Sequence, residues 1–157
     1  MRLTKLTVAL LLAALLLTAC GGAVAPEQPA EQVDLDALCQ KIEKVYPDMM
    51  AFEGDMRFNF LGIREEDCAQ CCTLLCDDGM KADELWLLEA ADDEAMERLV
   101  ELAEQRMEAK AQETKDYNPA QYEIVMQGQI LTSGRYLALI VTPEVEKAVR
   151  LFQEAVG

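Results

Sequence analysis

Six cysteines and a complete lack of histidine define the chemistry open to this chain. Cys68, Cys71, Cys72 and Cys76 form the pattern C-x-x-C-C-x-x-x-C, and Cys39 lies far upstream. Four thiolates so close in sequence could hold zinc or an iron–sulfur cluster if a helix or a turn gathered them. In a regular strand, side-chain alternation would place Cys71 on the face opposite to the other three, and no single ion could reach all four thiolates.

The sequence leaves three interpretations of these cysteines open. The favoured one is that they pack as small buried hydrophobic residues; in the others, Cys39 forms a disulfide with a strand cysteine, or the cluster is a metal or redox site. Once Cys20 is assigned to lipidation, as argued below, five thiols remain, so at least one is free or pairs between chains. We expect no bound cofactor, with zinc or an iron–sulfur cluster as the alternative.

Catalysis without histidine would have to use carboxylates, thiols, lysine or tyrosine. The lack of histidine excludes Ser-His-Asp and Cys-His arrangements. The chain also lacks the G-x-S-x-G motif of many hydrolases. We assign no catalytic residue, and the sequence favours a protein other than an enzyme.

Five residues are candidates for contact with a ligand. Asp83 and Glu84 lie where a strand is expected to begin, followed closely by Trp86, and charged groups there must be solvated, paired or functional. Tyr117 and Tyr122 flank an Asn-Pro pair and could stack on a ligand, or they could simply brace a short helix against the sheet.

The charge balance limits the possible partners. Fourteen lysines and arginines against 29 aspartates and glutamates give a formal net charge of −15. Such a surface repels phosphate backbones, which argues against nucleic acid as a partner. It also disfavours electrostatic docking on anionic lipid.

The N-terminal residues are typical of an export signal. A basic start is followed by an apolar run over 6–17, which is too short to span a bilayer. Residues 17–20 (LTAC) closely resemble the lipobox of bacterial lipoproteins, in which the cysteine, here Cys20, receives a lipid. We expect a signal peptide over 1–19, a lipidated Cys20 with a flexible tether over 20–33, and a single folded domain over 34–157.

Periodicity and turn residues predict an α+β fold for this domain. The expected order is an Asp34-capped helix, an irregular connection over 48–63, a hairpin of 69–76 and 82–90, a long helix from Asp92 or Asp93 to about Thr114, a short helix over 119–126, a hairpin of 129–132 and 135–141, and a C-terminal helix capped by Thr142. This order favours an antiparallel sheet of about four strands with helices packed mainly on one face.

The connection over 48–63 is rich in methionine and phenylalanine. Such a cluster could be an adaptable binding surface, but we expect these side chains to pack onto the core. The apolar residues of this segment are Met49, Met50, Phe52, Met56, Phe58 and Phe60.

Several short motifs occur in a characteristic order. After the lipobox and tether come residues 82–86 (ADELW), 116–122 (DYNPAQY) and 134–141 (GRYLALIV). In this order they resemble a family of bacterial lipoproteins catalogued as domain of unknown function 4358, with the similarity covering roughly 34–156. The resemblance implies a small extracytoplasmic lipoprotein, but it implies no activity, ligand or partner.

We therefore expect a lipid-anchored domain on the outer face of the cytoplasmic membrane, held there through Cys20. Its expected role is a binding or interaction module for a protein or another envelope component. The alternative is a thiol-based metal-binding or redox protein that uses Cys68, Cys71, Cys72 and Cys76.

Overall fold

The computed structural model describes residues 32–46 and 48–157. Val33–Gly157 form one compact unit, whereas the expected signal peptide and Cys20 lie outside the described residues. The helices are α2 (Leu35–Glu43), α3 (Gly54–Leu61), α4 (Asp93–Lys115), α5 (Pro119–Gln127) and α6 (Val145–Val156), with a 3-10 turn η1 (Glu65–Asp67). The strands are β1 (Met49–Ala51), β2 (Cys68–Cys76), β3 (Glu84–Ala90), β4 (Gln129–Ser133) and β5 (Tyr136–Val141).

The strands form one antiparallel sheet in the order β1-β2-β3-β5-β4. Strand β3 lies at its centre, and all seven of its residues are buried. Trp86 of β3 pairs with Thr73 of β2 on one side and with Leu139 of β5 on the other. Each predicted hairpin is present, since β2 joins β3 through a loop over 77–83 and β4 joins β5 through a tight turn at 134–135. The α+β class and the antiparallel sheet predicted from the sequence are therefore confirmed.

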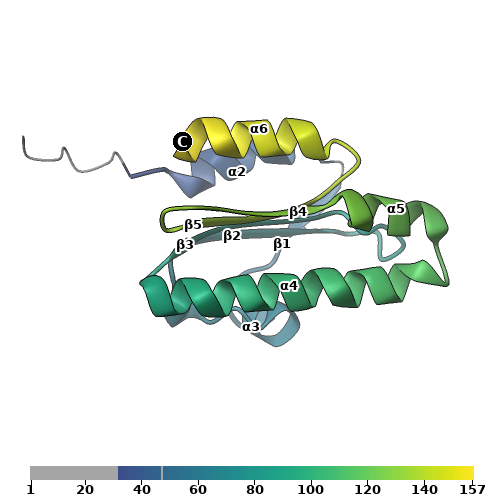
Figure 1. Ribbon diagram of the computed structural model, residues 1–157, viewed down its shortest axis with the longest axis horizontal. Helices are drawn as coiled ribbons and strands as arrows, with labels where there is room; N and C mark the ends of the chain where they lie inside the picture. The colour runs from purple at the N-terminus through teal and green to yellow at the C-terminus, as the bar shows by residue number, and fades with distance from the viewer. Residues whose placement is uncertain (1–31, 47) are drawn as a thin grey trace, which may run out of the picture. The chain divides into compact units, whose positions relative to one another are not determined.

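Helices cover both faces of the sheet, which corrects the prediction that they would pack mainly on one face (Figure 1). Trp86 and Leu88 point to the face covered by α4, where a first core cluster forms, and Leu85 and Leu87 point to the face of α2 and α6, where a second forms. Because β3 is apolar on both of its faces, each face has to be shielded from water. A one-sided arrangement would leave half of this strand exposed.

The segment over 48–63, expected to be irregular, contains an edge strand and a helix. Strand β1 pairs with the end of β2, which gives the sheet five strands instead of the four predicted. Helix α3 begins at Gly54 and ends at Leu61, and the C-cap residue Gly62, with a left-handed φ of 74°, donates its N–H to the Phe58 carbonyl at 2.9 Å. Both elements are short, and neither has a clear apolar period, so the sequence pattern did not reveal them.

The predicted helix caps are largely confirmed. Asp34 accepts a hydrogen bond from the Ala37 N–H at 2.9 Å, and Asp92 accepts one from the Ala95 N–H at 2.7 Å. The C-terminal helix is the exception, because α6 begins at Val145 with Glu144 as its N-cap residue, two positions after the predicted Thr142 cap. Within the described ranges, no helix is both long and apolar enough to cross a membrane.

Candidate functional site

Helix α3 presents unusually large apolar side chains to solvent. Met56, Phe58 and Phe60 are 43, 54 and 68% exposed, and Leu61 is the one residue of this helix that is buried. Leu61 and Ile63 anchor the C-terminal end of α3 in the core on the α4 side of the sheet. The helix is therefore firmly attached, yet most of its apolar surface lacks a partner within the described part of the chain. Met56 and Phe60, four residues apart, share one side of the helix and Phe58 lies on another; large apolar side chains gathered on one exposed helix in this way indicate a candidate interaction site.

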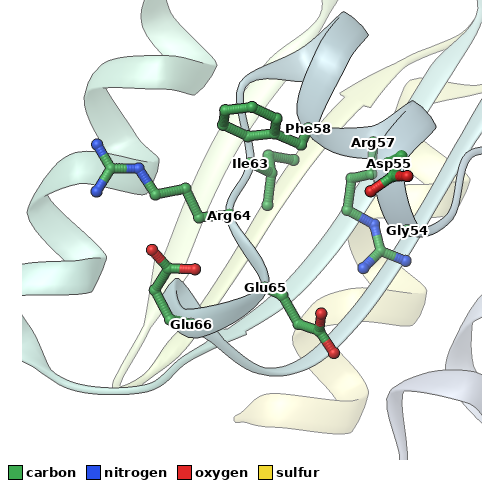
Figure 2. A pocket seen from close by; sticks show the side chains of 8 residues that line it. All are labelled: Gly54, Asp55, Arg57, Phe58, Ile63, Arg64, Glu65 and Glu66. Atoms are coloured by element: carbon green, nitrogen blue, oxygen red, sulfur yellow. The ribbon is translucent and has the colours of Figure 1, made fainter.

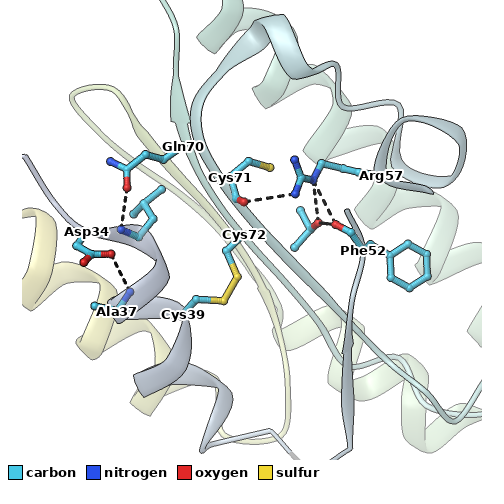
Figure 3. Close-up of a disulfide and its surroundings, with 10 residues drawn as sticks. Asp34, Ala37, Cys39, Phe52, Arg57, Gln70, Cys71 and Cys72 are labelled. Carbon is cyan, nitrogen blue, oxygen red and sulfur yellow. Dashed lines mark hydrogen bonds between the residues drawn. A yellow bond between two sulfur atoms is a disulfide. The ribbon is translucent and has the colours of Figure 1, made fainter. Parts of the chain in front are cut away.

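Arg57 fastens α3 to the sheet (Figure 3). Its Nε donates to the Phe52 carbonyl and to Thr73 Oγ1, both at 3.2 Å, and its Nη2 donates to the Cys71 carbonyl at 3.4 Å. All three acceptors are uncharged. Among the described residues, no carboxylate lies within ion-pairing distance of Arg57, so its positive charge is not neutralised.

A hollow of about 620 Å³ opens between α3 and the η1 segment (Figure 2). Arg57 and Phe58 reach it from α3, and Arg64, Glu65 and Glu66 reach it from the segment that follows. The hollow thus combines two guanidinium groups and an aromatic ring with the carboxylates of Asp55, Glu65 and Glu66. We call this hollow together with the exposed side chains of α3 the α3 surface.

Two of the cysteines form a disulfide. Cys39 of α2 is bonded to Cys72 of β2, with Cα atoms 6.5 Å apart, and the bond fastens α2 to one face of the sheet (Figure 3). This pairing is one of the alternatives left open by the sequence. It uses the Cys72 thiol, which is therefore not available to a metal ion in this state.

A β-bulge changes the faces to which the remaining cysteines belong. In the pairing of β2 with β3, Cys68 lies opposite Ala90 and Gln70 opposite Glu89, so Ala69 is an extra residue. The bulge brings Cys68 to the face of Cys71, and both pack against the core cluster on the α4 side. The regular alternation expected from the sequence, with Cys71 alone on its face, is therefore wrong.

The four clustered cysteines do not converge on one point. Cys72 is directed to the α2 side, and Cys76 lies near the end of β2, paired with Met49. Over 32–46 and 48–157, no group of three or more candidate ligands is placed to hold a metal ion. What the structure does bring together is the pair Cys68 and Cys71, both half-buried and both free thiols.

The two thiols of this pair are in different electrostatic states. Hydrogen bonding by the neighbouring Cys71 thiol is the main cause that lowers the pKa of Cys68, and the charge of Arg57 acts in the same direction, whereas burial and the negative charge of Asp67 oppose the shift. The same hydrogen bond, together with burial, raises the pKa of Cys71. Cys68 is thus the better thiolate, and Cys71 retains its proton.

Glu84 is the centre of a buried ionic network. Its carboxylate is fully enclosed and accepts hydrogen bonds from Arg106 at 2.8–3.0 Å and from the indole Nε1 of Trp86 at 2.7 Å. Lys110 Nζ lies 2.8 Å from the same carboxylate and donates to the Ala82 carbonyl at 2.9 Å. The structure thus joins two of the candidate ligand-contact residues, Glu84 and Trp86, and gives both intramolecular partners.

The neighbouring Asp83 is also buried. It is 4% exposed, its Oδ1 has no hydrogen-bond partner in the described part of the chain, and burial raises its pKa. Asp83, Glu84 and Trp86 are all enclosed, so contact with a ligand would require this region to open. Their assignment as ligand contacts stays a prediction.

The two candidate tyrosines occupy different environments. Tyr117 is 90% exposed and borders a small hollow of about 160 Å³, whereas Tyr122 is half-buried on α5 and does not line that hollow. Other side chains brace α5 against the β2–β3 loop: Asn118 Nδ2 donates to the Met80 carbonyl at 3.3 Å, and Gln121 Oε1 accepts from the Ala82 N–H at 2.7 Å. The structure therefore does not bring the two tyrosines together at one site.

Only some of these features could be predicted from the sequence. The methionine- and phenylalanine-rich segment was noted as a possible binding surface, but its side chains were expected to pack onto the core. That expectation holds for Phe52, which is buried, and for Met49, which is half-buried against the core; it is wrong for Met50 and for the three exposed residues of α3. Arg57 and Arg64 were not singled out, although Arg57 stands between Met56 and Phe58 in a segment poor in basic residues.

Fold and site together define a five-stranded antiparallel sheet covered on both faces, with one exposed apolar helix and one pair of adjacent thiols. Residues 42–142 match the family described as Domain of unknown function (DUF4358), and because this match spans more than half of the chain, the chain belongs to that family. No curated protein and no solved structure matches it. The resemblance stated from the sequence is thus confirmed for the family, and the lipoprotein character stays a prediction.

Proposed function

We propose that this protein is a membrane-anchored extracytoplasmic lipoprotein that binds a partner protein of the cell envelope through the α3 surface. The anchor would be the lipid on Cys20, as residues 17–20 indicate. The observation that carries the binding function is the exposure of Met56, Phe58 and Phe60 on one well-anchored helix.

The chemistry of the α3 surface favours a protein segment with apolar side chains and an acidic group. Aromatic residues, methionine and arginine are enriched at the centres of protein interfaces. Among the described residues, neither Arg57 nor Arg64 forms a salt bridge, so either could pair with a carboxylate of the partner. The net charge of −15 argues against an anionic lipid surface as the occupant.

Site-specific photocrosslinking in cells tests the binding function. A photoreactive residue at Phe60 is expected to yield one discrete protein adduct. The same residue at Met126, which is 61% exposed on α5, is the matched control and should not yield that adduct. Arg64→Glu should weaken the adduct at Phe60. Equal adducts at both positions, adducts to lipid, or no adduct at Phe60 would contradict the proposal.

Membrane fractionation tests the anchor separately. The wild-type chain should incorporate labelled fatty acid and sediment with membranes, and Cys20→Ala should abolish the labelling. Incorporation that persists in Cys20→Ala would refute lipidation at this residue. Crosslinking reports on the α3 surface and labelling on Cys20. A negative result in one experiment therefore does not affect the interpretation of the other.

A further inference from the structure

We propose that Cys68 and Cys71 form a thiol–disulfide exchange site, in which Cys68 attacks a disulfide of another molecule and Cys71 resolves the product. This inference goes beyond the proposed binding function, because it uses different residues and does not depend on a partner at the α3 surface. Of the four clustered cysteines that the sequence suggested for a redox site, the proposal uses two, Cys68 and Cys71.

The backbone geometry of β2 brings the two thiols together. Without the bulge at Ala69, residues three apart in a strand would point to opposite faces. With the bulge, Cys68 and Cys71 share the α4 face and pack against the same core cluster. Both are half-buried, so a substrate disulfide can reach the pair without unfolding of the strand.

The existing disulfide is separated from this pair by the sheet. Figure 3 shows the Cys71 side chain and the Cys39–Cys72 bond on opposite sides of β2. The pair can therefore exchange electrons while the Cys39–Cys72 bond continues to hold α2 in place. Cys76, the other free thiol of the described residues, lies toward the far end of the strand and provides an internal comparison.

The surroundings give the two thiols distinct roles. The interaction with Cys71 and the charge of Arg57 favour the thiolate form of Cys68 and outweigh burial and the negative charge of Asp67, and a thiolate is the species that attacks a disulfide. Cys71 holds its proton until the attack has occurred. This division corresponds to an attacking and a resolving cysteine in a C-x-x-C sequence.

The exchange balances without any further reactant. The Cys68 thiolate attacks one sulfur of a substrate disulfide, the substrate S–S bond breaks, and the departing thiolate takes up a proton. Cys71 then loses its proton and attacks the Cys68 sulfur, and the second substrate thiol leaves. Two electrons and two protons pass from the Cys68 and Cys71 thiols to the substrate disulfide, which becomes two thiols, and a Cys68–Cys71 disulfide remains.

Titration with the aromatic disulfide 5,5′-dithiobis(2-nitrobenzoate) tests the two roles by stoichiometry. The full chain is used in a Cys20→Ala, Cys76→Ser background with the Cys39–Cys72 bond intact, so that Cys68 and Cys71 are its two remaining thiols. The pair is expected to release two thionitrobenzoates and to retain none, because Cys71 displaces the second. Cys71→Ser should release one and retain one as a stable adduct on Cys68, identified by tandem mass spectrometry.

Several results would overturn the proposal. They are retention of one adduct on each thiol in the unsubstituted pair, faster reaction at Cys71 than at Cys68, or no reaction in the folded chain.

Equilibration with reduced and oxidised glutathione provides a second measurement that needs no substitution at the pair. Trapping by alkylation should show Cys68 and Cys71 losing reactivity together while Cys76 stays alkylatable, and independent loss would contradict the pairing. Comparing the rates of glutathione disulfide and insulin reduction then shows whether a small or a protein disulfide is the better substrate.

Discussion

Neutralising Glu84 is expected to remove a large part of the stability of this fold. Glu84→Gln keeps the size of the side chain and an oxygen that can accept from Trp86 Nε1, so the main loss is the negative charge. Arg106 and Lys110 are 23 and 8% exposed and would then face each other without a counter-charge. Breaking a buried ion pair by removing one partner costs about 3–5 kcal/mol, and we expect a decrease of this size in the free energy of unfolding.

A second buried carboxylate provides the matched control. Asp67 is as deeply buried as Glu84, but its partner Arg98 is 43% exposed and can turn into water when the charge is removed. Asp67→Asn should therefore cost less, about 1.5–3 kcal/mol, the range for hydrogen bonds to a charged group. Both variants remove a buried carboxylate, but only Glu84→Gln leaves buried cations without a counter-charge. The difference between the two losses in the free energy of unfolding therefore measures the cost of the unpaired buried cations.

Urea unfolding followed by circular dichroism measures both losses. Trp86, the single tryptophan of the chain, supplies an independent fluorescence signal. Adding Lys110→Met to Glu84→Gln should recover part of the loss, since it removes the more deeply buried of the two stranded cations. A loss under about 1 kcal/mol for Glu84→Gln, or an equal loss for Asp67→Asn, would refute the reasoning.

Three further predictions address other parts of the domain. Cys39→Ser should lower the free energy of unfolding by about 3–4 kcal/mol, because the disulfide with Cys72 closes a loop of 33 residues; addition of dithiothreitol should destabilise the wild type to a similar extent and leave the variant nearly unchanged. Burial raises the pKa of Asp83 above its ordinary value of 3.8, so the folded state binds this proton more tightly than the unfolded state. As the pH rises from 3.8 through the folded pKa, ionisation of Asp83 therefore lowers the free energy of unfolding. Urea unfolding of Asp83→Asn across this range should show its stability relative to wild type increasing with pH, and a constant difference would contradict the shift. Gly62→Ala should lower the stability measured by thermal unfolding more than Gly134→Ala does. Both glycines have a positive φ, which costs a residue with a side chain about 1–2 kcal/mol. Only at Gly62 does the new methyl group also lie 3.1 Å from a leucine side chain of α4.

Local patterns predicted most of the fold because the relevant interactions are local. Asp34 and Asp92 were recognised as helix caps, since a cap bonds to a backbone N–H only three residues away. The two hairpins followed from turn residues between apolar runs. The central position of β3 followed from an apolar run without a polar face, and all seven of its residues are buried.

The prediction that helices pack mainly on one face of the sheet was wrong, although the apolar run of β3 argued against it. Residues 85–88 are apolar on both faces, which requires cover on both faces of the sheet, but nothing in the order of the elements states which helix lies on which side. Helices α2 and α6, at opposite ends of the described chain, pack on the same face because only the tertiary fold brings them together. Strand β1 was missed because three residues that pair with a distant strand carry no periodicity of their own.

The sequence by itself determined the chemistry available to this protein: five thiols beyond Cys20, no imidazole, a strong negative charge and an apolar segment with one arginine in its middle. Only the tertiary structure decided how these groups are used. Pairing between β2 and β3 forces out the extra residue Ala69, and this one bulge moves Cys68 next to Cys71. Packing of α2 on the opposite face brings Cys39 to Cys72. Which thiols meet depends on contacts between segments far apart in the chain, and residue spacing alone does not specify those contacts.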